Sequence, residues 1–210
     1  MTADVIRHRL GFALRVEDHF SNVPIDETLD IAIDSKETGV RSRAGSLRHD
    51  DGTYRWSDLG DGLRELTITS PSKRWINWDP SPLEVSVPLG DPREAVRYEM
   101  WPTALASVSP GLSAIRGKLL GTGIAGVRIE VAGAGQPPTG RYTFSDEAGE
   151  FLYLLTGGHW PITTVGTLAL QINAVGRTVT GGDIVGDGSF AGDQFELPPL
   201  RDMRVRFHVT

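Results

Sequence analysis

Residues 127–131 read Val-Arg-Ile-Glu-Val, so apolar side chains alternate with charged ones through the stretch. Successive side chains of a β-strand point to opposite faces, and the alternation therefore predicts a strand with one face in a core. We find no amphipathic helical pattern longer than about two turns. An all-β chain is predicted, because the same spacing of two recurs in residues 10–16, 29–33, 66–68, 83–87, 96–100, 142–144, 168–172 and 205–209.

Turn-forming residues separate the predicted strands, and the chain holds 25 glycines and 13 prolines. Such residues are typical of the tight turns that join many short strands. With 210 residues, the chain is about twice as long as one β-sandwich domain. Residues 101–113 (WPTALASVSPGLS) are poor in charge and contain two prolines, as expected of an ordered linker. We therefore predict domains at 1–105 and 113–210, joined by a linker at 106–112.

The alternation also predicts which side chains lie in the two cores. In the first domain they are Phe12, Leu14, Ile31, Ile33, Tyr54, Trp56, Leu66 and Ile68. In the second they are Ile115, Val127, Ile129, Val131, Phe144, Phe151, Tyr153, Leu170, Ile172 and Phe207.

A weak internal repeat relates the two halves. Residues 50–56 read DDGTYRW, and residues 146–153 read DEAGEFLY. Each stretch is an acidic turn, then a glycine, one further residue and an aromatic residue that begins the next strand. Glycine supplies the positive φ that such a turn requires, and the aromatic side chain is expected in the sandwich core.

The second half has a family likeness. Residues 115–120 (IRGKLL), 123–131 (GIAGVRIEV) and 145–151 (SDEAGEF) together resemble the carboxypeptidase regulatory-like domain, whose β-sandwich is of the transthyretin-like, prealbumin type. Ala125 stands where that family usually has proline, and Val127 stands where it usually has alanine. The resemblance implies a carboxypeptidase regulatory-like domain at 113–210.

The first half is similar to a divergent copy of the same domain, through residues 22–25 (NVPI) and 51–59 (DGTYRWSDL). The likeness implies two tandem Ig-like or transthyretin-like sandwiches. It says little about function, because one fold serves many functions. Such domains accompany others as spacers, adhesins or parts of assemblies, and a tandem pair also resembles the small accessory proteins of bacterial, phage-tail-like injection machines.

The sequence offers no set of residues for catalysis. It has no cysteine, and no two of its five histidines lie within ten residues of each other, so metal-ligand spacings are missing. Ser70 and Lys73 have the S-x-x-K spacing, but they lie in a loop rather than on the helix that aligns such a pair. No glycine-rich loop precedes a helix. We expect no enzyme activity, no catalytic residue and no cofactor.

Two stretches are candidates for binding. Trp75 and Trp78 lie three apart in a polar segment and are interpreted as one core and one edge-covering indole, with a protein hot spot or a sugar platform as alternatives. Asp183, Asp187 and Asp193 lie in a glycine-rich stretch and are a weak candidate for calcium. The alternative for this stretch is a long loop with Asx turns.

The charge pattern narrows the class of partner. The net charge is −6, and no basic block is present, which argues against nucleic acid. No run of apolar residues is long enough for a membrane span, and residues 1–14 lack the core of a signal peptide, so we expect a cytoplasmic location as synthesised. The prediction is a non-catalytic structural or adaptor module that binds a partner protein or itself, within a larger bacterial assembly. The alternative is a carbohydrate- or calcium-dependent ligand-binding domain.

Overall fold

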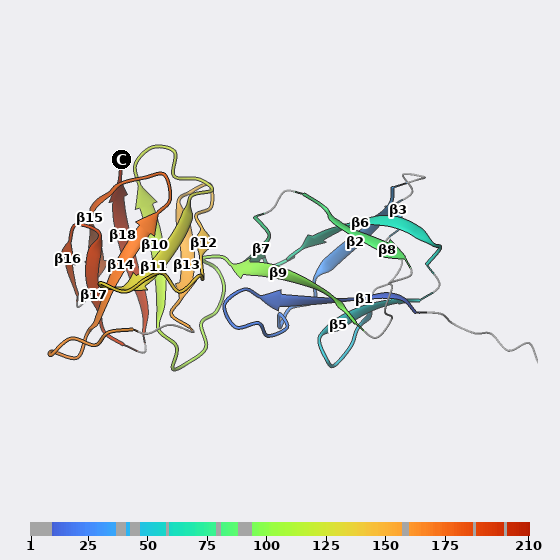
Figure 1. Ribbon diagram of the computed structural model, residues 1–210, viewed down its shortest axis with the longest axis horizontal. Helices are drawn as coiled ribbons and strands as arrows, with labels where there is room; N and C mark the ends of the chain where they lie inside the picture. Colours follow the sequence, from blue (N-terminus) through green and yellow to red (C-terminus); the bar gives the residue numbers. More distant parts are fainter. Residues whose placement is uncertain are drawn as a thin grey trace, which may run out of the picture. The chain divides into compact units, whose positions relative to one another are not determined.

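The computed structural model describes residues 10–36, 41–42, 47–57, 59–78, 81–87, 94–156, 160–186, 188–199 and 201–210. All regular elements in these ranges are β-strands, and the predicted all-β class is confirmed (Figure 1). No helix in them is long and apolar enough to cross a membrane. The strands of the first half are β1 (Leu10–Asp18), β2 (Asp30–Ser35), β3 (Arg41–Ser42), β4 (Leu47–Arg48), β5 (Thr53–Ser57), β6 (Gly62–Thr69), β7 (Trp75–Ile76), β8 (Leu83–Val87) and β9 (Val96–Pro102).

The remaining strands follow residue 113. They are β10 (Ala114–Leu120), β11 (Arg128–Gly133), β12 (Thr143–Phe144), β13 (Glu150–Leu154), β14 (Leu168–Ala174), β15 (Val179–Val185), β16 (Ser189–Ala191), β17 (Gln194–Leu197) and β18 (Asp202–Val209).

Two compact units make up the chain. Unit 1 comprises Met1–Asp18, Asn22–Ser72 and Asp79–Met100, whereas unit 2 comprises His19–Ser21, Lys73–Trp78 and Trp101–Thr210. The division falls within β9, and the stretch 106–112 that the sequence assigns to a linker is part of unit 2. The limits of independently folding domains at 105 and 113 stay a prediction.

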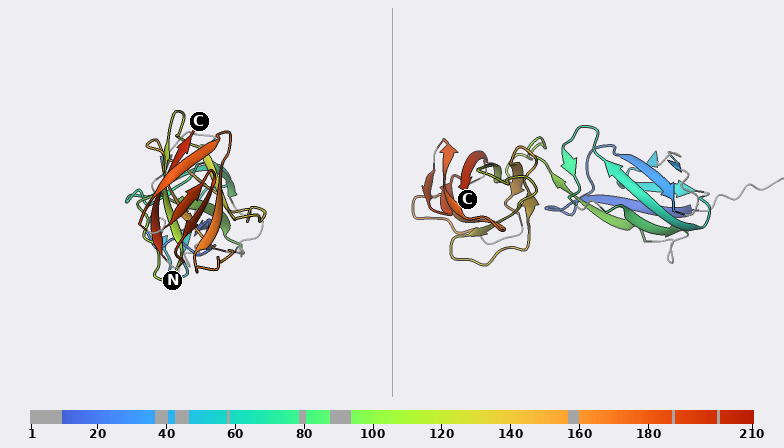
Figure 2. Two further views of the ribbon diagram at one scale, coloured as in Figure 1. Left: turned by 90° about the vertical axis from the view of Figure 1, so that its left-hand side faces the viewer. Right: turned by 90° about the horizontal axis from the view of Figure 1, so that it is seen from above.

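The two units share the order of their central paired strands. Figure 2 shows the strands of both units from two further directions. In unit 1, β1 lies between antiparallel β5 and parallel β9, and in unit 2, β10 lies between antiparallel β13 and parallel β18. The second sheets run β3-β2-β6-β8 and β12-β11-β14-β17, with β16 added at the end of the latter. The weak repeat in the sequence thus coincides with a repeat in strand order.

The turn that signals the repeat has the same geometry twice. Gly52 and Gly149 have φ of 78° and 77°, the left-handed region that glycine adopts without strain. The Gly52 amide donates to the His49 carbonyl, and the Gly149 amide donates to the Asp146 carbonyl, each at 2.9 Å. Glycine is therefore required at both turns, as the sequence predicts.

Aromatic rings and aliphatic side chains fill each core. In unit 1, Phe12 stacks on Trp56 with ring centroids 4.4 Å apart, and both are buried. In unit 2, the inward faces of both sheets contribute to a single cluster. The phenol of Tyr153 is buried there and donates to the carbonyl of Val131, and burial raises its pKa. Two predicted core residues differ: Ile31 and Phe144 are only partly buried.

Candidate functional site

The two tryptophans singled out in the sequence belong to unit 2. Trp75 lies in β7, where it pairs with Pro102 of β9. Trp78 is partly buried against the core, and its ring lies 5.3 Å from that of Phe144. Both indoles are thus partly covered by their own unit. Their role in binding stays a prediction.

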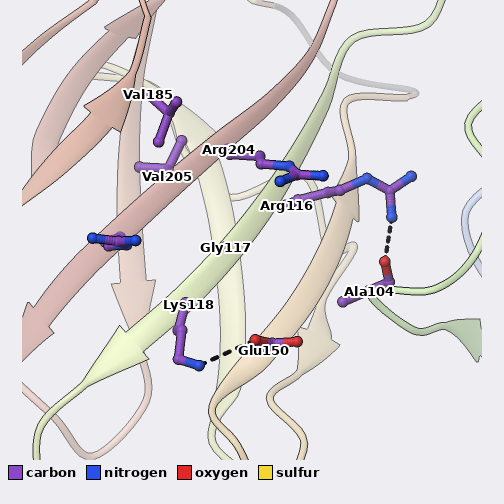
Figure 3. A pocket seen from close by; sticks show the side chains of 9 residues that line it. Ala104, Arg116, Gly117, Lys118, Glu150, Val185, Arg204 and Val205 are labelled. Carbon is purple, nitrogen blue, oxygen red and sulfur yellow. Dashed lines mark hydrogen bonds and ion pairs between the residues drawn. The ribbon is translucent and has the colours of Figure 1, made fainter.

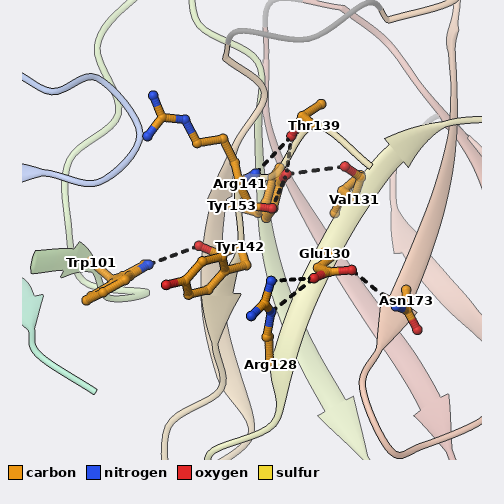
Figure 4. Close-up of polar contacts among 9 residues, drawn as sticks. All are labelled: Trp101, Arg128, Glu130, Val131, Thr139, Arg141, Tyr142, Tyr153 and Asn173. Carbon is orange, nitrogen blue, oxygen red and sulfur yellow. Dashed lines mark hydrogen bonds and ion pairs between the residues drawn. The ribbon is translucent and has the colours of Figure 1, made fainter. Parts of the chain in front are cut away.

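Around them, unit 2 has an aromatic cluster that the sequence did not reveal. The buried His19 stacks on Trp101 at 4.8 Å and lies 4.7 Å from the ring of Tyr142. The Trp101 indole donates to the Tyr142 carbonyl at 3.0 Å, as Figure 4 shows. Residues 19–21 therefore pack in unit 2, although they directly follow β1 in the sequence.

A charged network closes one side of this cluster. The guanidinium of Arg128 lies 4.0 Å from the centroid of the Tyr142 ring, a cation–π contact (Figure 4). The same guanidinium pairs with Glu130 at 2.7 Å, and the Asn173 amide donates to the other Glu130 oxygen at 3.3 Å. Every charge in the network has a partner, and this points to a structural role rather than to a vacant binding site.

Two of the three aspartates of the predicted calcium loop, Asp183 and Asp193, interact with other side chains. Asp183 lies on β15 and pairs with His208 at 3.3 Å. Asp193, between β16 and β17, accepts a hydrogen bond from Gln171 at 2.7 Å. Asp187 lies outside the described residues. Within the described ranges, no three His, Asp or Glu side chains are grouped so as to hold a metal ion.

Ser70 and Lys73, the S-x-x-K pair, lie in a loop that hydrogen bonds to Glu27 stabilise. The Ser70 hydroxyl donates to both carboxylate oxygens of Glu27 at 3.1 Å, and the Ser72 hydroxyl donates to the same carboxylate at 2.6 Å. Lys73 has a φ of 58°, which places it in a turn and not in a helix. The carboxylate therefore holds the loop in place.

The most distinctive polar surface lies on the outer face of the β13-β10-β18-β15 sheet. On β10, the inward Ile115, Gly117 and Leu119 alternate with Arg116 and Lys118. On β18, the inward Met203, Val205 and Phe207 alternate with Arg204, Arg206 and His208. Alternation on both strands therefore sends basic side chains to the same side of the sheet.

Parallel pairing places these residues directly side by side. Arg116 pairs with Arg204, and Lys118 pairs with Arg206. The result is a two-by-two array of cations, with spacings of about 4.8 Å between strands and about 6.7 Å along each strand. We call these four residues the cationic face. The four side chains line a depression of about 520 Å³. Figure 3 shows Arg116, Lys118 and Arg204 in it, with Ala104 and Val185 on opposite sides.

The four cations differ in their own partners. Arg116 donates to Asp202 at 2.7 Å, to the Ala106 carbonyl at 2.7 Å, and to the Ala104 carbonyl. Lys118 pairs with Glu150 at 3.1 Å. Arg204 and Arg206 are exposed, and their side chains form no hydrogen bond or ion pair with any residue that the structure describes.

Like charges directly opposite each other on a sheet are destabilising, and unit 2 has two such rows in succession. Unit 1 balances the corresponding strands. There, the row of Arg15 and Arg97 is followed by a row of Glu17 and Glu99, and Arg15 Nε lies 2.6 Å from Glu17 Oε1. In unit 2, the row after Lys118 and Arg206 holds Leu120 and His208 instead. The cationic face thus lacks the acidic row of unit 1, and its acidic neighbours across the strands are Glu150, opposite Lys118, and Asp183, opposite Arg206.

Comparison with known proteins gives only distant likenesses. No family model matches the chain, and no curated protein matches its sequence. Among solved structures, the chain is similar to the Bacillus anthracis TIE protein, with 10% identity and a TM-score of 0.32 over 96% of this chain and 33% of that protein. The shaft pilin SpaA from Lactobacillus rhamnosus GG gives 10% identity and a TM-score of 0.32, over 96% and 98% of the two chains.

BcpA, the major pilin subunit of Bacillus cereus, gives 8% identity and a TM-score of 0.33, over 96% and 99% of the two chains. The chain spans about a third of the length of the TIE protein and nearly all of both pilins. Likenesses with identities and TM-scores this low give no basis for assigning a function or a partner to this chain. The carboxypeptidase regulatory-like assignment stays a prediction.

The cationic face can bind anions with high geometric selectivity. Guanidinium groups stay protonated at all ordinary pH values and offer paired donors that match a carboxylate. In the sequence, this face corresponds to Arg116-x-Lys118 and Arg204-x-Arg206. Basic residues on the solvent side of a strand are common, so these two patterns did not by themselves indicate a site. Only the pairing of β10 with β18, which are far apart in the sequence, brings the four cations together.

Proposed function

We propose that the chain is a non-catalytic structural or adaptor module, and that the cationic face of unit 2 binds a partner protein. The observation that carries the proposal is the pair Arg204 and Arg206. They are exposed, lie in a depression, and have no partner among the described residues. Placing like charges in adjacent rows costs stability, and a bound anion offsets that cost.

The chemistry around the face favours a protein over a polyanionic polymer. The net charge of −6 repels nucleic acid at long range, and four cations are few for a backbone-tracking groove. None of the residues that line the depression is aromatic, whereas single-strand and sugar sites use aromatic platforms. Val185, with 60% of its surface exposed, adds an apolar margin beside arginine, as in protein interfaces.

The setting we propose is a larger bacterial assembly of the phage-tail-like kind, which follows the resemblance of the tandem domains. Two units with the same strand order suit a spacer or adaptor, because each can present its own surface. The carboxypeptidase regulatory-like family is the assignment we propose for both units, on the residues that carry the resemblance.

Site-specific photocrosslinking in the native host tests the proposal. A photoreactive amino acid at Val185 is expected to capture a discrete protein, and capture should disappear in Arg204→Ala/Arg206→Ala. The matched control is Val175, a valine of the same unit that is 48% exposed. Equal capture at both positions would count against the face.

The sequence-based alternative has its own outcome in the same experiment. The alternative would replace the proposal if no protein is captured and the chain is instead retained on a polysaccharide column or binds a ligand only in the presence of calcium. A crosslink to a second copy of the chain would identify self-association as the form of protein binding.

A further inference from the structure

The spacing of the cationic face carries information about its partner. Arg204 and Arg206 lie at alternate positions of one strand, so their side chains leave β18 about 6.7 Å apart. An extended peptide has the same repeat, because it is built from the same backbone. Carboxylates at alternate positions of such a peptide therefore match the two arginines one to one.

We propose that the cationic face binds an extended segment of a partner protein with acidic residues at alternate positions, [DE]-x-[DE]. This proposal rests on the proposed function and names the chemistry of its partner. Each carboxylate of the segment pairs with one of the two arginines. The residue between the carboxylates points away from the sheet.

The other two cations position the segment. Asp202 and two carbonyls already hold Arg116, and Glu150 holds Lys118, so both are oriented before binding. Both line the depression beside Arg204 and Arg206, whose guanidiniums form no hydrogen bond or ion pair with any residue that the structure describes. Bidentate pairing with a carboxylate is stronger and more directional than a lysine contact.

The partner is a different protein and not a second copy of the chain. No two acidic residues of the 210 are separated by one residue, so the chain contains no [DE]-x-[DE] segment. The paired acids Asp34, Glu65 and Glu84 form a row across strands, but their spacing is about 4.8 Å. Lys36 also engages Glu65 and Glu84.

Binding of labelled octapeptides, measured by fluorescence anisotropy at low salt, tests the spacing directly. One peptide alternates glutamate and threonine. The second has the same composition in the order Glu-Glu-Thr-Thr-Glu-Glu-Thr-Thr, in which no two glutamates are separated by one residue. The full chain is expected to bind the alternating peptide about tenfold more tightly, because only that peptide has carboxylates on one face about 6.7 Å apart, the spacing of the two arginines. Raising the salt should weaken both.

Variants tie the binding to the two arginines. Arg204→Ala/Arg206→Ala should lower the affinity for the alternating peptide about tenfold. Arg204→Lys/Arg206→Lys should lower that affinity less, because it keeps both charges but not the bidentate geometry. Arg97→Ala is the matched control, because Arg97 is exposed on β9, the strand of unit 1 that corresponds to β18. It should leave binding unchanged.

Three results would overturn the inference. They are equal affinity for the alternating peptide and for the peptide of paired glutamates, equal loss of binding in Arg97→Ala, and tighter binding of a single-stranded oligonucleotide of equal charge. Each would leave the proposed function standing if crosslinking at Val185 still captures a protein. Conversely, peptide selectivity without a crosslinked protein would confirm the spacing and refute the adaptor role.

Discussion

Gly117 lies in the middle of β10, and replacing it with alanine tests how tightly the core beneath the cationic face is packed. A Cβ at this position would lie 1.9 Å from Cζ of Phe151. Carbon atoms pack at about 3.5 Å or more, so the ring would have to move by roughly 1.6 Å. Phe151 is 1% exposed and stacks on Phe207 with centroids 5.9 Å apart, which leaves the ring little room.

Overpacking of this kind costs about 1–3 kcal/mol, and the lower chain entropy of alanine returns about 0.5–1 kcal/mol. We therefore expect Gly117→Ala to lower the free energy of unfolding by about 1 kcal/mol, with the ring displaced. Urea unfolding followed by tryptophan fluorescence should show a midpoint lower by about 0.5 M. Four of the five tryptophans (Trp75, Trp78, Trp101 and Trp160) belong to unit 2, so the signal reports mainly on that unit.

A double variant separates the clash from other effects. Phe151→Leu should destabilise unit 2 by itself, but in that background Gly117→Ala should cost little, because the obstructing ring is gone. Gly60→Ala is the control, since its new Cβ would meet only the flexible Arg64 side chain at 3.3 Å. A midpoint that Gly117→Ala leaves unchanged or raises would refute the packing argument.

Two further predictions concern other parts of the chain. Hydrogen bonds from Thr53, together with the charge of Arg55, lower the pKa of Asp51 from 3.8 to about 2. The ionised carboxylate therefore stabilises the fold above its unfolded pKa, and this contribution is lost as the pH falls from 3.8 to about 2. Urea titration at several pH values compares the wild-type chain with Asp51→Asn. The difference in their free energies of unfolding should shrink over that pH interval. Trp78→Ala removes a ring packed on Phe144 and should lower the free energy of unfolding of unit 2 by about 1–3 kcal/mol. Crosslinking from Val185 on the cationic face should be unchanged. Loss of that crosslink in a folded variant would instead favour the tryptophans as the binding site.

The strands and much of the core could be predicted from the sequence, because alternation is a local property. Leu14, Ile129 and Phe207 lie at alternating apolar positions of their strands, and all three are buried. The acidic turns were also predictable, since Gly52 and Gly149 mark positions where only glycine is free of strain. Ile31 and Phe144 have the right spacing but are only partly buried. Alternation predicts which face of a strand a side chain lies on, but not how completely other segments bury that face.

The cationic face and the division into units depend on pairings between distant segments. Arg116 meets Arg204 only because β10 and β18 are parallel neighbours, and no local pattern encodes that partnership. His19 follows β1 directly, but it belongs to unit 2 because its ring stacks on Trp101. The indole of Trp78 likewise finds Phe144 across the chain. Sequence spacing alone left these contacts undetermined.

The parallel ladder between β10 and β18 also determines how unit 2 responds to tension. The ladder runs over seven paired positions, from Ala114 with Asp202 to Leu120 with His208. The chain enters at the start of β10 and leaves at the end of β18, so a pull on those two points acts along the strands in opposite directions. Such a load shears all the ladder hydrogen bonds at once instead of opening them one by one. Forced unfolding is governed by the unfolding rate, and a shear-loaded ladder makes that step slow.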